Sequence, residues 1–231
     1  MKSALIGPAL FYLLLSASCK HGKQPEAIQS ESSSTAEVVL SQLISGNLSF
    51  KNEIGAHTYN HSRLYTYMDQ VAASRNDQHP LAFILSCIDS RVPPEIIFDQ
   101  GIGQLFVGRV AGNVEDPYML GSMEYAVNVK HVKLIIVLGH TNCGAIHAAF
   151  GHVDSSNEDL VPLIGHVKEG IVATDTEPFD ASARHNVAIT VEHILKYSKV
   201  IRSMVEAHQL VIAGGLYDVA KGTVDWNMKG W

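Results

Sequence analysis

Two cysteines and one histidine are the residues in this sequence best suited to holding a metal ion. Cys87 is followed by Ile-Asp-Ser-Arg, and His140 lies three residues before Cys143 in the segment His-Thr-Asn-Cys. Together they offer one imidazole nitrogen and two sulfurs, a donor set that zinc accepts in tetrahedral sites. Three protein ligands leave one position open, which is typical of a catalytic zinc. The sequence therefore predicts a zinc centre at Cys87, His140 and Cys143.

Asp89 and Arg91 follow Cys87 closely enough to lie beside the same ion. An aspartate near an open zinc position can accept a proton from bound water or become the fourth ligand, and both alternatives stay open. Arg91 can pair with this carboxylate, fix its orientation and keep it ionised. We therefore predict that Asp89 and Arg91 are catalytic residues.

The alternatives to a metal site fit the sequence less well. A disulfide between Cys87 and Cys143 is the main one. The first residues of the chain, described below, are typical of an export signal, and an exported protein meets an oxidising compartment. That bond would leave His140 and Asp89 without a role. Arg91 is four residues after Cys87, which does not fit the Cys-x5-Arg loop of cysteine phosphatases. The sequence contains no Gly-x-Ser-x-Gly elbow and no Walker loop.

The segments that must position these residues alternate between strands and helices. Continuous apolar runs predict strands, as in a parallel sheet buried on both faces, at 81–86, 105–110, 132–139 and 210–218. Helical spacing of apolar residues predicts helices at 37–50, 65–74, 117–129, 144–150, 183–197 and 200–207. We expect a single α/β domain with a mostly parallel central sheet flanked by helices. Cys87 and His140 close two strands, at the sheet edge where such folds bind ligands.

Composition fits one such domain with a short N-terminal extension. The chain has 231 residues, of which 46% are hydrophobic, so a substantial core can form. Its formal net charge of -6 argues against a nucleic-acid partner.

The first residues are typical of an export signal. Residues 1–18 combine Lys2, an apolar run at 4–15 and small residues, and Cys19 follows directly. Two interpretations stay open: lipidation of Cys19, as in bacterial lipoproteins, or plain cleavage. Residues 19–36 are polar and Ser-rich and predict a flexible tether. The catalytic domain is expected at 37–231.

The motifs around the predicted zinc ligands resemble those of the β-class carbonic anhydrases. The resemblance rests on CIDSRVPPEIIFDQGIGQLFVGRVAGN, GSMEYAV and GHTNCGA in this order, and it extends from about residue 38 to GGLYDVAKGTVDW, which ends at 226. It implies a β-carbonic anhydrase-like fold with an N-terminal helical arm and one zinc ion per subunit. It also implies reversible hydration of CO2 to bicarbonate and a proton by attack of zinc-bound hydroxide, with Asp89 and Arg91 beside the bound water.

The resemblance further implies substrate-binding residues and an oligomer. Gln78 matches a glutamine that binds substrate from the neighbouring subunit. Phe106 and Tyr125 match residues of a narrow substrate pocket, and both equally suit an ordinary core. The expected assembly is a homodimer or a dimer of dimers. With the export signal, the expected location is the periplasm, either free or held to the membrane by a lipid on Cys19.

Two other functions remain open at this point. The motifs position a zinc-bound nucleophile but do not select its substrate, so a hydrolase of COS or CS2 on the same scaffold is an alternative. A noncatalytic metal-binding or disulfide-bonded envelope protein is the other.

Overall fold

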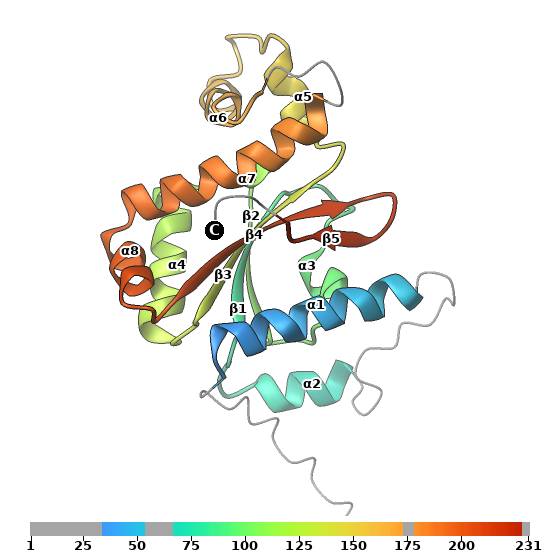
Figure 1. Cartoon of the computed structure of the whole chain (residues 1–231), viewed down its shortest axis with the longest axis vertical. Coiled ribbons are helices and arrows are strands. Elements are labelled where there is room, and N and C mark those ends of the chain that lie inside the picture. The colour runs from blue at the N-terminus through green and yellow to red at the C-terminus, as the bar shows by residue number, and fades with distance from the viewer. Residues whose placement is uncertain (1–33, 54–66, 173–177, 228–231) are drawn as a thin grey trace, which may run out of the picture.

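The computed structural model describes residues 34–53, 67–172 and 178–227, which Figure 1 shows in colour. The export signal expected at 1–18, Cys19 and nearly all of the tether expected at 19–36 lie outside these residues. Ala36, the last residue of the expected tether, begins the first helix. Among the described residues, no helix is both long enough and apolar enough to span a membrane.

The central layer is a five-stranded sheet with the strand order β2-β1-β3-β4-β5. Its strands are β1 (Ala82–Ser86), β2 (Leu105–Arg109), β3 (Leu134–His140), β4 (Val211–Asp218) and β5 (Thr223–Asp225). Strands β1 to β4 are parallel, and β5 pairs antiparallel with β4. The expected mostly parallel sheet is therefore confirmed. The hydrophobic pattern does not predict β5, because so short a strand shows no periodicity.

Helices cover both faces of the sheet, as Figure 1 shows. One face is covered by α1 (Ala36–Glu53) and α3 (Pro94–Ile97), and α2 (Tyr67–Ser74) precedes β1. The core on the other face includes residues of α4 (Pro117–Val129), α5 (Gly144–Phe150), α6 (Leu160–Lys168), α7 (Pro178–Tyr197) and α8 (Lys199–Glu206). A short 3-10 helix, η1 (Ala111–Asn113), follows β2.

Side chains of β1 alternate between two hydrophobic cores. Phe83 and Leu85 belong to the core with α4 and α7, whereas Ala82 and Ile84 belong to the core with α1 and α3. Both sets are almost completely buried. Burial on both faces explains why the strand sequence is continuously apolar rather than alternating.

The expected N-terminal helical arm corresponds to α1 and α2, and α1 packs against the sheet of its own chain. Its residue Leu43 is completely buried in the core. The buried amide of Asn47 donates to the carbonyls of Ile97 (3.3 Å) and Gly222 (3.0 Å) and accepts the N–H of Val224 (2.9 Å). One side chain thus ties α1 to the end of α3 and to β5.

Candidate metal centre

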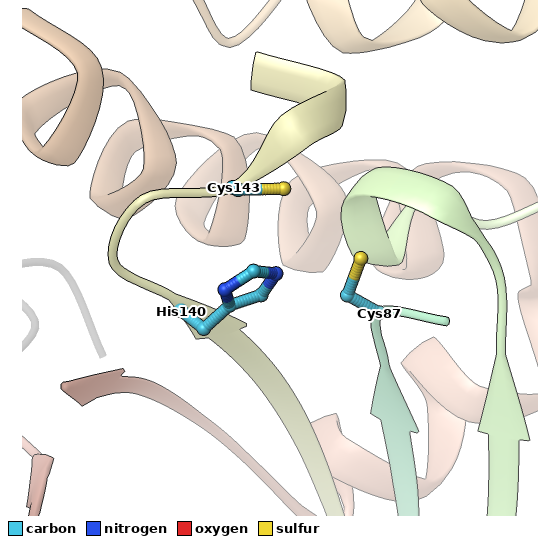
Figure 2. A group of neighbouring side chains, drawn as sticks. All are labelled: Cys87, His140 and Cys143. Carbon is cyan, nitrogen blue, oxygen red and sulfur yellow. The ribbon is translucent and has the colours of Figure 1, made fainter. Parts of the chain in front are cut away.

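The three predicted zinc ligands meet at the carboxyl ends of two neighbouring strands. Cys87 directly follows β1, His140 is the last residue of β3, and Cys143 is the N-cap residue of α5. Figure 2 shows their side chains pointing toward one another, and their ligand atoms all lie within 4.8 Å of each other. Pairing of β1 with β3 brings residues from distant parts of the chain to one point.

The turn between His140 and Cys143 is held from three sides. Asn142 adopts a left-handed conformation (φ 54°), which asparagine tolerates better than most residues, and this reverses the chain. Its N–H donates to Asp180 Oδ1 (3.0 Å). The N–H of Thr141 donates to the carbonyl of Tyr217 (2.9 Å), and its hydroxyl accepts the N–H of Val219 (3.1 Å). These bonds aim His140 and Cys143 at the same point.

His140 presents a free nitrogen to the cluster. Its Nδ1 lies 2.9 Å from the carbonyl oxygen of Thr141, which can only accept, so Nδ1 carries the proton. Nε2 is therefore a lone-pair donor, and it is buried without any hydrogen-bond partner. Buried polar atoms normally find a partner, and metal-bound histidines commonly donate their other N–H to a carbonyl. The His140 side chain thus fits a metal ligand.

Cys87 and Cys143 complete a donor set that fits zinc. Both are buried free thiols, so the alternative disulfide is not formed. A hydrogen bond with Cys143 lowers the pKa of Cys87 to about 4, and the N–H of Gly112 also donates to its Sγ (3.4 Å). The same bond and burial raise the pKa of Cys143. Two close thiols therefore share one proton, and a bound cation would allow both to be thiolates.

Asp89 lies beside this cluster and is held by Arg91. Arg91 donates from Nε to Oδ1 (2.9 Å), from Nη2 to Oδ2 (2.7 Å) and from its backbone N–H to Oδ1 (2.9 Å). Its guanidinium also donates to the carbonyl of Asn142 (3.1 Å). The hydrogen bonds from the Arg91 side chain, followed by the one from its backbone N–H, hold the pKa of Asp89 well below its usual range. Oδ2 of Asp89 is 3.9 Å from Nε2 of His140.

Two further residues support the centre and are missed by the sequence patterns. Arg109, at the end of β2, donates to the carbonyls of Cys87 (3.0 Å) and Asp89 (2.6 Å) and fixes that segment. Gly112 has φ +74°, and a Cβ there would lie 2.6 Å from Val167 Cγ2. The position of Arg109 at the end of a strand is a usable signal, because ligands gather at that edge.

The three predicted substrate residues do not form one group within a single chain. Phe106 and Tyr125 are neighbours, with ring centroids 6.2 Å apart. Gln78 is exposed and precedes the first residue of β1, whereas Cys87 follows the last. A strand of this length separates its ends by roughly 17 Å. The roles of these residues remain predictions, and Gln78 can serve this centre only from another subunit.

Comparisons with known proteins agree with these observations. A profile of the family described as "Carbonic anhydrase" matches residues 82–224. Carbonic anhydrase 2 of Mycobacterium tuberculosis is 40% identical over 167 residues, 67% of this chain and 78% of that protein. The carbonic anhydrase of Pseudomonas aeruginosa is 33% identical over 165 residues, 64% of this chain and 73% of that protein. The structure of Coccomyxa β-carbonic anhydrase in complex with acetazolamide has a TM-score of 0.63 at 26% identity, covering 81% of this chain and 86% of that one.

A mostly parallel sheet flanked by helices, with a Cys and a His at adjoining strand ends and a second Cys at the start of the next helix, defines a metalloenzyme scaffold. The family match spans all three metal-site residues. The chain therefore belongs to the carbonic anhydrase family, in its β class, and is a zinc-dependent enzyme.

Proposed function

We propose that this enzyme catalyses the reversible hydration of CO2 to bicarbonate and a proton at the Cys87, His140 and Cys143 centre. The observation that carries the proposal is the position of the Asp89 carboxylate. Arg91 holds it so that its Oδ2 lies 3.9 Å from Nε2 of His140, which has no hydrogen-bond partner. Zinc held by these three residues supplies a nucleophile near neutral pH by lowering the pKa of a water molecule.

Asp89 serves this reaction as a fixed hydrogen-bond acceptor. Its low pKa keeps it ionised at neutral pH, and an ionised carboxylate only accepts hydrogen bonds. It can therefore accept the O–H of a hydroxide nucleophile and orient it so that a lone pair of the hydroxide oxygen faces the substrate carbon. The same low pKa makes Asp89 a poor carrier for the proton that the reaction releases.

We infer that Asp89 stays with Arg91 rather than becoming the fourth zinc ligand. Three hydrogen bonds from Arg91 hold the carboxylate, and Arg91 is itself held by the carbonyl of Asn142. Moving Asp89 onto the metal would break this bidentate pair, whose planar geometry is demanding. This arrangement would leave the fourth position of a bound zinc ion to the water molecule that the ion activates.

The proposed assembly is a homodimer, either alone or paired into a tetramer. Strand β2 is an edge strand with half-buried residues, and such edges readily pair with another chain. Large exposed apolar side chains lie on α2 and α4, among them Met68 (72%) and Tyr118 (89%). Gln78 would then come from the partner. Structures of two tetrameric β-carbonic anhydrases from Sordaria macrospora have a TM-score of 0.57 and 25% identity to this chain, covering 75% of it and 91% of that chain.

The proposed location is the periplasm, with residues 1–18 as the export signal. Lys2, the apolar run that follows it and the small residues before Cys19 support this proposal. Mass spectrometry of the mature N-terminus distinguishes a lipid-modified Cys19 from a plainly cleaved chain. An intact N-terminus in purified protein from the native cell would contradict export.

Stopped-flow measurement of CO2 hydration on the purified chain, with zinc measured on the same sample, tests the activity. Release of sulfide from COS and CS2 is measured in parallel. Fast CO2 hydration that is lost in Cys87→Ser supports the proposal. Faster turnover of COS or CS2 would reassign the substrate, and a zinc-loaded but inactive protein would indicate a noncatalytic metal-binding protein.

A further inference from the structure

A second group of metal-ligating side chains lies outside the centre just described. It consists of Glu115, His166 on α6 and His193 on α7, whose ligand atoms all lie within 4.8 Å of one another. Oε1 of Glu115 is 3.1 Å from Nε2 of His166 and 3.1 Å from Nδ1 of His193. The two nitrogens are 3.3 Å apart. We call these three residues the Glu115 cluster.

The three atoms form a nearly equilateral triangle of a size that suits a metal ion. Ligands about 2.0–2.1 Å from a tetrahedral zinc lie roughly 3.3 Å from one another. The observed separations of 3.1, 3.1 and 3.3 Å are close to that value. Hydrogen bonding alone does not satisfy the group equally well when Glu115 is ionised and can only accept. If both imidazole nitrogens donate to Glu115, the 3.3 Å contact between His166 and His193 places two donors against each other.

The side chain of His193 is oriented as a metal ligand. Its Nδ1 faces the cluster, and its other nitrogen, Nε2, lies 3.4 Å from Oε2 of Glu169. A carboxylate behind the second nitrogen is the usual partner of a metal-bound histidine, because it fixes the tautomer and the ring orientation. The ring of His166 meets that of His193 at 84°, so the two nitrogens approach the shared point from different directions.

Glu115 gives an independent indication of a missing partner. Its side chain is only 2% exposed, and its Oε2 atom is buried with no hydrogen-bond partner. Burial raises the pKa of this carboxyl. Within the described part of the chain, the ion-pair partners found for Glu115 are the two histidines alone. A buried carboxylate is costly without a compensating charge, and a divalent cation would supply one.

We propose that Glu115, His166 and His193 form a second site for a divalent transition-metal ion such as Zn²⁺. The donor set of two imidazoles and one carboxylate suits this class of ion rather than Mg²⁺ or Ca²⁺, which prefer oxygen ligands throughout. Glu169 is a positioning residue that holds His193. The bound ion joins α6, α7 and the segment after η1.

This second site adjoins the first through η1. Gly112 donates its N–H to Cys87 Sγ, and its carbonyl accepts the side-chain amide of Asn186 on α7 (2.7 Å). Glu115 lies three residues further along the chain. A metal at the Glu115 cluster therefore stabilises the segment that carries Gly112, and its role is structural. The existence of this second site does not depend on the reaction at the first centre.

Zinc stoichiometry is the primary test. The purified full-length chain is equilibrated with a roughly tenfold molar excess of Zn²⁺, desalted, and its bound zinc is measured by mass spectrometry. We expect two zinc ions per chain, one for each cluster. The same treatment with Mg²⁺ alone should leave no magnesium at the cluster. One zinc per wild-type chain would overturn the proposal, whatever the variants do.

Variants assign each ion to its site. His193→Ala and Glu115→Gln should each retain one zinc, whereas His152→Ala, a change at an exposed histidine, should retain two. Glu169→Gln should lower the affinity for the second zinc ion by about 10–100-fold, as expected when a metal-bound histidine loses its carboxylate partner. Glu192→Gln, at an exposed glutamate next to His193 on α7, is its control. Two zinc ions in folded His193→Ala, checked by circular dichroism, would contradict the assignment.

Cobalt spectra separate this proposal from the proposed activity. Cobalt bound to thiolates absorbs strongly in the near ultraviolet, whereas cobalt bound to imidazole and carboxylate does not. Cys87→Ser should lose this band and CO2 hydration but keep one metal ion. His193→Ala should keep the band and lose the other ion. If Cys87→Ser binds no metal, the second site does not exist, even when the wild-type enzyme hydrates CO2.

Discussion

Arg91 holds the carboxylate of Asp89 through two side-chain hydrogen bonds, at 2.9 Å from Nε to Oδ1 and 2.7 Å from Nη2 to Oδ2. A planar guanidinium can form such a pair, whereas the single ammonium group of lysine cannot. The pair keeps Asp89 ionised and facing the metal centre.

Substitutions of this pair should lower activity without removing zinc. We expect Arg91→Lys to lower kcat/KM about tenfold and Asp89→Asn about 100-fold, since a positioned acceptor is lost while the metal ligands stay. Stopped-flow kinetics and zinc content measured on the same samples check this. Asp159→Asn, at an exposed position, should behave as wild type. Loss of zinc in Asp89→Asn would show instead that Asp89 is a ligand.

Two glycine substitutions should have opposite effects on stability. Gly112→Ala forces a side chain into a left-handed backbone position and against Val167, so it should destabilise the fold by about 2 kcal/mol or more and weaken zinc binding. Gly121→Ala lies in α4, where a Cβ meets nothing within 4 Å, and should stabilise by about 0.5–1 kcal/mol. Urea unfolding measures both changes. Equal stabilities for the two variants would contradict the assigned role of Gly112.

The buried amide of Asn47 should be important for stability but not for chemistry. Asn47→Ala leaves the carbonyls of Ile97 and Gly222 and the N–H of Val224 without this partner, at a cost of about 2–4 kcal/mol. Thermal unfolding of the variant should therefore begin at a lower temperature. Asn128→Ala, at an exposed position in α4, should change stability by less than about 0.5 kcal/mol. A loss as small in Asn47→Ala would mean that α1 contributes little to the domain.

The turn after β4 should contribute stability that depends on pH. The side chain of Lys221, followed by backbone N–H groups of Ala220 and Lys221, lowers the pKa of Asp218. A carboxyl whose pKa is lower in the folded state stabilises the fold above its unfolded pKa of about 3.9. That contribution is lost as the pH falls below this value toward the folded pKa.

Comparison with Asp218→Asn isolates this contribution. The variant should be less stable than wild type near neutral pH, by up to about 1 kcal/mol, because the partner Lys221 is largely exposed. The difference should shrink as the pH falls below about 4, and urea unfolding at several pH values measures it. If the stability difference between wild type and Asp218→Asn stays constant down to about pH 2, the charge of Asp218 has no role.

The sequence predicts the main strands and the zinc ligands for the same physical reason. Continuous apolar runs mark strands buried on both faces, and residues at the ends of such strands share one edge of the sheet. Strand ends and ligand chemistry together therefore suffice to place Cys87 and His140 at one site. Their predicted roles as zinc ligands follow from this placement and from the family.

Features that depend on contacts between distant segments are not visible in the sequence. The place of Arg109 at a strand end marks it as near the site, but it does not reveal that the side chain donates to two carbonyls after β1. Glu115 and His193 are separated by α4, β3, α5 and α6, so their meeting depends on how α7 packs. The short elements α3 and β5 are set by tertiary contacts rather than by periodicity.

The pairing of β1 with β3 also has a consequence for the order of folding. Cys87 and His140 are separated along the chain by α3, β2, η1 and α4, yet the register places Ser86 opposite Leu138. A nascent chain cannot assemble the three ligands until β3 and the start of α5 have been synthesised and have docked beside β1. The entropic cost of closing this long loop must be met before zinc can add stability. Zinc capture therefore reports that β3 has docked beside β1, and the order of the strands prevents the ion from binding before that step.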